Sequence, residues 1–103
     1  MTKIALIAKL TTDPANAADV EAALAATCEA AAEEGGLEIY SAHRDEGEPG
    51  VYWFFELYTD EAAVEVHGKG DGMKAAMGAL GGLLTARPEI SRLTPVAAKG
   101  LDL

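Results

Sequence analysis

The stretch VYWFFELY, residues 51–58, decides how this chain folds. It is bulky and apolar throughout apart from one charged residue, Glu56. Side chains alternate between the two faces of a strand, so the stretch predicts a strand that is apolar on both faces. An open sheet with helices on one face normally shows polar residues on the other. The second face therefore needs a cover of its own, and we expect a second copy of the chain to provide it in a homodimer.

The neighbouring segments extend this strand into a sheet. Upstream, Leu37–Asp45 predicts a second strand, joined to the first by the polar turn 46–50. Downstream, residues 59–61 supply the capping oxygen and the acid that favour the start of a helix. Residues 73–85 continue with helical spacing, and three glycines within residues 68–72 predict a break between the two helical parts.

The ends of the chain complete the pattern. Ile4–Thr11 predicts a strand, and the alanine-rich segment 14–34 predicts a helix that ends at two glycines. Ile90–Val96 predicts a last strand, and Pro95 within it favours an edge position or the end of a strand. The order strand, helix, hairpin, helix, strand is the βαββαβ or ferredoxin-like arrangement. We expect a single α+β domain over residues 1–103, with the helices on one face of the sheet.

The chain is short and acidic. Its 103 residues hold 17 acids against 8 bases, which gives a net charge of −9. Such a charge repels phosphate backbones and anionic lipids and argues against nucleic-acid and membrane partners. The first residues read as a strand and not as a signal peptide. One cysteine, Cys28, excludes an internal disulfide and a cysteine metal cluster. We therefore expect a cytoplasmic protein.

Three segments carry a resemblance to a known family. They are IAKL at 7–10, GLEIYSAHRD at 36–45 and FELYTDEAAVEVH at 55–67. In this order they resemble the antibiotic biosynthesis monooxygenase family, and the likeness runs from about residue 4 to about residue 95. The resemblance implies a dimeric α+β barrel, in which two sheets face each other and each subunit holds a site between its sheet and its helices. Members of the family include oxygenases of quinols and anthrones that need no cofactor, and others degrade haem.

Two departures from the family pattern limit the chemistry. Many quinol-oxygenase-like members have a second histidine five residues after the one that matches His67, and here that position is Gly72. The glycine argues against a histidine pair and against a metal site. The haem-degrading branch has characteristic residues near positions 8, 58 and 77, which are alanine, tyrosine and methionine in this chain. Haem chemistry is therefore not expected.

Oxygenation without a cofactor needs a base, a hydrogen-bond donor for the developing anion, and a dry pocket. His67 is the first candidate for the base, because imidazole titrates near neutrality. His43 is the second candidate. Tyr58 is the candidate donor, since the resemblance implies that its face of the strand looks toward the helices. A structural role stays open for each of them. His67 could be a helix-end histidine that bonds a carbonyl, His43 a dimer contact, and Tyr58 a core aromatic.

Further residues are expected to bind the substrate. Glu56 is the only acid in its strand and needs a partner once it is buried, and Arg44 on the neighbouring strand is the expected one. The acids Glu29, Glu33 and Glu34 are expected on a solvated helix face. The aromatic and methionine side chains have the alternative of serving as plain core. The expected substrate-binding set is Tyr52, Phe54, Glu56, Met73, Met77 and Arg44.

The leading functional prediction is a cofactor-independent monooxygenase of small, electron-rich aromatic substrates such as quinols or anthrones. The substrate would lose a proton and then react directly with molecular oxygen. No metal or other cofactor is expected. Two alternatives remain: a non-catalytic dimeric domain that binds a small molecule, and an isomerase or decarboxylase of the same fold, the latter on fold analogy alone.

Overall fold

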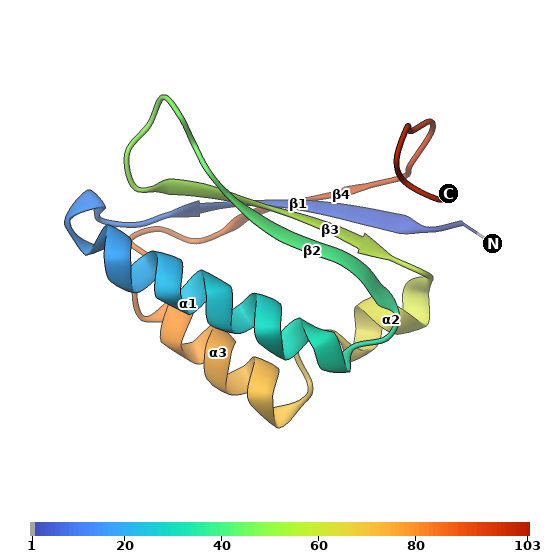
Figure 1. Cartoon of the computed structure of the whole chain (residues 1–103), viewed down its shortest axis with the longest axis horizontal. Helices are drawn as coiled ribbons and strands as arrows, with labels where there is room; N and C mark the ends of the chain where they lie inside the picture. Colours follow the sequence, from blue (N-terminus) through green and yellow to red (C-terminus); the bar gives the residue numbers. More distant parts are fainter. Residues whose placement is uncertain (1) are drawn as a thin grey trace.

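The computed structural model describes residues 2–103 and shows a four-stranded antiparallel sheet with helices packed against one face (Figure 1). The strand order is β2-β3-β1-β4. This is the ferredoxin-like α+β arrangement, and the predicted order of elements is confirmed. The elements are β1 (Ile4–Thr11), η1 (Pro14–Asn16), α1 (Ala17–Ala30), η2 (Ala31–Glu33), β2 (Leu37–Arg44), β3 (Val51–Tyr58), α2 (Glu61–Val66), α3 (Asp71–Gly81) and β4 (Glu89–Leu93).

Strand β3 lies inside the sheet, between β1 and β2, and pairs antiparallel with both. The register sets Tyr40 of β2 opposite Glu56, and Ser41 opposite Phe55. The side chains of one such cross-strand pair point to one face of the sheet, and those of the next pair point to the other face. The even-numbered side chains of β3 therefore face the helices, and the odd-numbered ones face the outer side of the sheet.

Helices α1 and α3 bury the even-numbered face of β3. Tyr52 and Phe54 are almost fully buried there against Val20 and Leu24 of α1 and Leu80 of α3. A second cluster surrounds Tyr58 at the other end of the strand, and its buried members are Ala31, Leu37, Ala63 and Met73. These two clusters leave a space between them under the middle of the sheet, and the candidate site lies there.

The helical segment after β3 is divided as the glycines predict. Helix α2 begins after Asp60, whose carboxylate accepts a hydrogen bond from the Ala63 amide at 2.9 Å. It ends at Val66, and the chain turns through Gly68 with φ of +81° before α3 begins. A left-handed turn of this kind favours glycine. The break therefore places His67 directly at the end of α2.

The last strand is shorter than predicted. It covers Glu89–Leu93 in place of residues 90–96, so Pro95 lies beyond it, and the expected edge position is confirmed. The segment 94–103 then folds over one end of the outer face, beside the N-terminal end of β1 (Figure 1).

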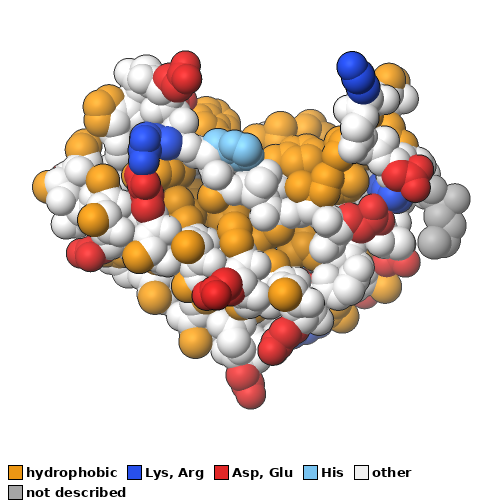
Figure 2. Space-filling model, in the orientation of Figure 1, with side chains coloured by type: hydrophobic (Ala, Val, Ile, Leu, Met, Phe, Trp, Pro, Cys, Tyr) orange, Lys and Arg blue, Asp and Glu red, His pale blue; other side chains and the backbone are white. Residues whose placement is uncertain are grey.

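The outer face of the sheet remains apolar beyond that segment. Ala5 and Leu57 are buried beneath residues 94–103, whereas Trp53 and Phe55 stay partly exposed. Figure 2 shows hydrophobic side chains in the dip between the β2–β3 hairpin and the C-terminal segment. The expectation of a strand that is apolar on both faces is thus confirmed.

The hairpin between β2 and β3 depends on one glycine. Gly50 has φ of +84°, and an added Cβ would collide with the carbonyl oxygen of Thr12. Both the amide and the hydroxyl of Thr12 donate to the Gly50 carbonyl at 2.8 Å, so the backbone there has little freedom to move away. The turn therefore has no room for a side chain at this position.

We expect Gly50→Ala to lower the free energy of unfolding by about 1–3 kcal/mol, through left-handed backbone strain and the collision with Thr12. Urea denaturation measures the loss. Gly47→Ala in the same turn is the matched control, because a Cβ there meets only the Asp45 carboxylate at 3.6 Å and the backbone is not left-handed. Equal stability of the two variants would contradict the assignment of strain to position 50.

Candidate functional site

A cavity of about 340 Å³ lies between the inner face of the sheet and α3. Its walls are largely apolar, and its polar side chains are Tyr40, Glu56 and His67. A concave, mostly apolar space with a few converging polar groups is typical of a small-molecule site. The apolar lining consists of Leu6, Ala8, Leu10, Phe54, Met77, Leu80, Leu84, Pro88 and Ile90, with Gly81 at the end of α3.

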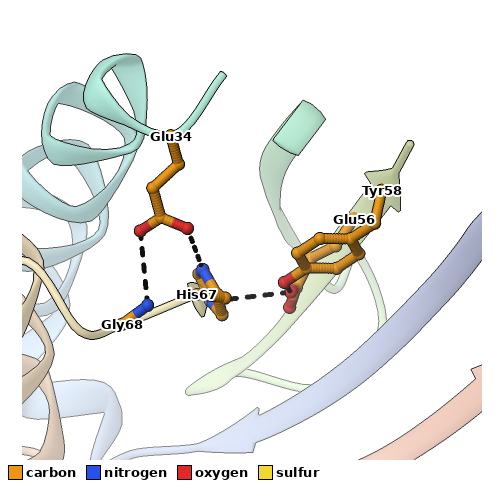
Figure 3. A network of polar contacts seen from close by, with 5 residues as sticks. All are labelled: Glu34, Glu56, Tyr58, His67 and Gly68. Atoms are coloured by element: carbon orange, nitrogen blue, oxygen red, sulfur yellow. Dashed lines mark hydrogen bonds and ion pairs between the residues drawn. The ribbon is translucent and has the colours of Figure 1, made fainter. Parts of the chain in front are cut away.

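His67 is held by Glu34, a glutamate at the end of the first helical segment. Its Nδ1 lies 2.8 Å from Oε1 of Glu34, which follows η2. The second oxygen of Glu34 accepts a hydrogen bond from the Gly68 amide at 3.3 Å. Figure 3 shows the carboxylate bridging these two neighbouring residues. The bridge fixes the imidazole ring and the backbone that carries it.

The other ring nitrogen of His67 points toward β3. Its Nε2 lies 3.8 Å from Oε1 of Glu56, which is too long for a hydrogen bond. The same oxygen of Glu56 accepts a hydrogen bond of 2.5 Å from the Tyr58 hydroxyl. Figure 3 shows the ring of His67 between the two carboxylates, with one on each side. Nε2 is therefore the ring nitrogen without a hydrogen-bond partner among the described residues.

Burial dominates the electrostatics of this cluster. It raises the pKa of Glu56, although the Tyr58 hydrogen bond and the nearby His67 act in the opposite direction. Burial also raises the pKa of Tyr58, and the bond to Glu56 adds to the rise. For Tyr40, burial and then the charge of Glu56 raise the pKa. Both phenols are thus neutral at physiological pH.

Aromatic rings frame the imidazole. The ring of Tyr40 stacks on Phe54 with a centroid distance of 4.4 Å. His67 meets Tyr40 and Tyr58 edge-on, at 5.4 and 5.6 Å. Contacts of this geometry are favourable. The site therefore presents an imidazole held among aromatic rings at the polar end of a largely apolar cavity.

The structure brings together only part of the predicted site. Phe54, Glu56, His67 and Met77 line the cavity. Tyr58 has no exposed surface, and its hydroxyl is engaged by Glu56, so it reaches the cavity only through that carboxylate. Met73 is buried in the cluster around Tyr58 and does not line the cavity.

The expected ion pair between Arg44 and Glu56 is wrong. The register sets Arg44 opposite Tyr52, four pairs along the strand from the pair that holds Glu56. Arg44 instead donates two hydrogen bonds to Glu21 of α1, at 2.7 and 2.9 Å, and the Tyr52 hydroxyl donates to the same carboxylate at 2.8 Å. This cluster borders a separate groove between α1 and β2, apart from the cavity.

His43 lies away from the cavity. It pairs with Trp53 in the sheet, and its side chain contacts the Ser41 hydroxyl at 2.9 Å on the outer face. The side chain is exposed. Gly72 also lies outside the cavity lining, and a Cβ at that position would have Glu33 as its nearest neighbour, at 3.9 Å.

Two residues around His67, Glu34 and Tyr40, were not predicted from the sequence. Glu34 was expected on a solvated helix face with Glu29 and Glu33, and that expectation is wrong, because its side chain is only 11% exposed against His67. No signal in the sequence marks this contact, which spans 33 positions. Tyr40 was within reach, since alternation along 37–45 places it on the same face as Ala42, next to Phe54.

Within residues 2–103, no three histidine, cysteine or acidic side chains gather in a way that could hold a metal ion. In the same part of the chain, no helix is both long and apolar enough to cross a bilayer.

The fold and the cavity together define a ferredoxin-like α+β protein with an apolar ligand-sized space between sheet and helices. The sequence model for antibiotic biosynthesis monooxygenases matches residues 3–79. The chain belongs to the antibiotic biosynthesis monooxygenase family. No curated protein sequence matches it.

Several solved structures resemble this chain. A Caulobacter crescentus protein whose name places it among the antibiotic biosynthesis monooxygenases is 34% identical, with a TM-score of 0.87 over 93% of this chain and 92% of that one. A Nitrosomonas europaea protein of unknown function is 29% identical, with a TM-score of 0.81 over 99% and 97% of the two chains. A Chloroflexus aurantiacus structure named for the same family shares the fold at 20% identity, with a TM-score of 0.84 over 98% and 100%.

The buried carboxyl of Glu56 gives the fold a pH dependence. Because burial raises its pKa in the folded protein above the ordinary 4.5, the folded state holds this proton to higher pH than the unfolded state. The free energy of unfolding therefore falls as pH rises from 4.5 through the raised pKa. We expect Glu56→Gln to lack this part of the fall, so that it loses less stability than the wild type over that range.

Urea denaturation at a series of pH values measures the difference. Glu65→Gln, an exposed position on α2, removes the same charge and is expected to follow the wild-type curve. Parallel curves for Glu56→Gln and the wild type would show that Glu56 ionises in the folded protein as it does in the unfolded chain.

Proposed function

We propose that this protein is a cofactor-independent monooxygenase of small, electron-rich aromatic substrates, of the quinol or anthrone kind. The observation that carries the proposal is His67 at the polar end of the apolar cavity, with Nδ1 engaged by Glu34 and Nε2 free of hydrogen bonds. Membership of the family supports the reaction type. The cavity, about 340 Å³, is of the size that small ligands occupy.

In the proposed reaction, Nε2 of His67 accepts a proton from the substrate, which comes from the hydroxyl of a quinol or from the ring CH₂ of an anthrone. The resulting anion is electron-rich enough to reduce molecular oxygen directly. For an anthrone, the ring CH₂ loses two hydrogens and gains one oxygen atom as a ketone, and the second oxygen atom leaves as water. The substrate supplies all the electrons, so the proposal includes no metal and no organic cofactor.

The neighbouring residues have supporting roles in this proposal. Apolar walls that include Phe54 and Met77 would hold the aromatic rings and keep water away from the anion. Glu56 lies beside Nε2, and because burial raises its pKa it can share the proton that His67 takes up. Tyr58 would act through Glu56 by its hydrogen bond. His43 has no part, since it lies on the outer face.

A non-catalytic binding domain is the second candidate. One observation favours it: His67 lies between two carboxylates, at 2.8 and 3.8 Å, as in a structural ion pair of a protonated imidazole. In that case the histidine would hold the fold together and not accept a proton. Activity of variants at this position separates the two candidates.

We expect His67→Gln to lower turnover of an anthrone or reduced quinone by about 100- to 10,000-fold, because the amide cannot act as a base. Oxygen uptake without any added cofactor is the measurement, and the same assay under nitrogen should give no product. Loss of turnover in His43→Gln with full turnover in His67→Gln would contradict the assignment. No uptake with a broad panel of quinols and anthrones would favour the binding domain.

The proposal includes a homodimer formed through the outer face. The support is the apolar surface around Trp53 and Phe55, which residues 94–103 leave uncovered. Monomeric proteins rarely expose large contiguous apolar patches. A cytoplasmic location also belongs to the proposal, since a chain with one cysteine has no need of an oxidising compartment.

Light scattering should therefore give twice the 10.7 kDa mass of the chain. Trp53→Ala should loosen the dimer and lower the free energy of unfolding by about 3–5 kcal/mol, the usual cost of removing a large buried aromatic. Val66→Ala, at an exposed position of α2, is the control that should leave both unchanged. A Trp53→Ala variant with an unaltered dimer and melting temperature would place the interface elsewhere.

A further inference from the structure

We propose that Glu34 is the positioning residue of the site: its carboxylate keeps the proton of His67 on Nδ1 and leaves Nε2 as the acceptor that faces the cavity. This inference rests on the proposed function, in which His67 is the base. It assigns a role to a residue that neither contacts the cavity nor belongs to the strand that shapes it.

The hydrogen-bond donors around Glu34 determine which ring nitrogen of His67 carries the hydrogen. An ionised carboxylate has no hydrogen to donate, so both of its oxygens can only accept. Oε1 faces Nδ1 of His67 at 2.8 Å, and Oε2 faces the amide of Gly68 at 3.3 Å. Nδ1 must then carry a hydrogen, and a neutral imidazole ring keeps its lone pair on Nε2.

Only a carboxylate satisfies both neighbours while the ring proton stays on Nδ1. A glutamine side chain has one oxygen and one NH₂ group at the two positions. If its oxygen faced His67, the NH₂ would meet the donating amide of Gly68. If it were turned over, the NH₂ would donate to Nδ1 and shift the ring proton to Nε2. The bridge between two donors therefore selects glutamate over its isostere.

Among the described residues, no group other than Glu34 accepts a hydrogen bond from Nδ1 of His67. The titratable side chains that face His67 from the remaining elements are Glu56 and Tyr58 of β3 and Tyr40 of β2. Glu56 lies on the Nε2 side, and the Tyr58 hydroxyl is engaged by Glu56. Tyr40 meets the ring edge-on at a centroid distance of 5.4 Å. The choice of tautomer thus depends on Glu34.

Nitrogen NMR of histidine-labelled protein reads this tautomer directly, without any substrate. The chain has two histidines, and a His43→Gln sample identifies the signals of His67. In alkaline buffer we expect wild-type His67 to show a protonated Nδ1 and an unprotonated Nε2. In Glu34→Gln, and in Glu34→Ala, we expect the proton to move wholly or partly to Nε2, the nitrogen that free imidazole side chains favour in water.

The matched control is Glu33→Gln, which removes the same charge from an exposed neighbour and should leave the His67 signals in place. Turnover should fall at least about tenfold in Glu34→Gln, mainly in kcat, as for other residues that orient a catalytic histidine. A wild-type tautomer in both Glu34 variants would overturn the inference. Full turnover in His67→Gln would refute the proposed function, whereas the NMR result would still decide the role of Glu34.

Discussion

The antiparallel register of β3 with its two neighbours is the constraint on which the rest of this structure depends. Because side chains alternate along a strand, a slip of one residue would exchange the two faces of β3. Glu56 and Tyr58 would then point outward, and Trp53 and Phe55 would enter the core. The observed register sets Tyr40 opposite Glu56 and so gathers the polar wall of the cavity from two adjacent strands. Helices on one face then cover this polar wall.

Burial gives the polar cluster its particular chemistry. Two carboxylates lie within 3.8 Å of the ring nitrogens of His67, one on each side, where the protein interior strengthens every charge interaction. Each carboxylate has a further donor, the Gly68 amide for Glu34 and the Tyr58 hydroxyl for Glu56. Such satisfied networks hold their members in one geometry. The arrangement is therefore suited to handling one proton at a defined atom.

The fold could be predicted from the sequence because the sequence signals that specify it are local. Alternation in residues 51–58, the turn at 46–50 and the glycines near 70 each act over a few positions, and each matches the structure. The end of the last strand was less predictable, since pairing with β1, and not the apolar run itself, sets where β4 stops.

The site was only half predictable for the opposite reason. Phe54, Glu56, His67 and Met77 share the cavity because periodicity places them on faces that meet. The partner of Glu56 was mistaken, because alternation puts Arg44 on the correct face but only the register tells which residue it opposes. Glu34 was beyond reach, since its contact with His67 joins the ends of two helices that no local pattern relates.

The short helix α2 has a consequence for how the site at His67 responds to heating. Six residues are too few to form a stable helix alone, so α2 depends on the Asp60 cap, on packing against β3 and on the Glu34 bridge at its far end. Segments with so few supports open locally at a lower free energy than the sheet that carries them. The geometry around His67 thus belongs to a separate, weaker cooperative unit than the β-sheet. On heating, the arrangement of Glu34, His67 and Gly68 should come apart before global melting, with the sheet still intact.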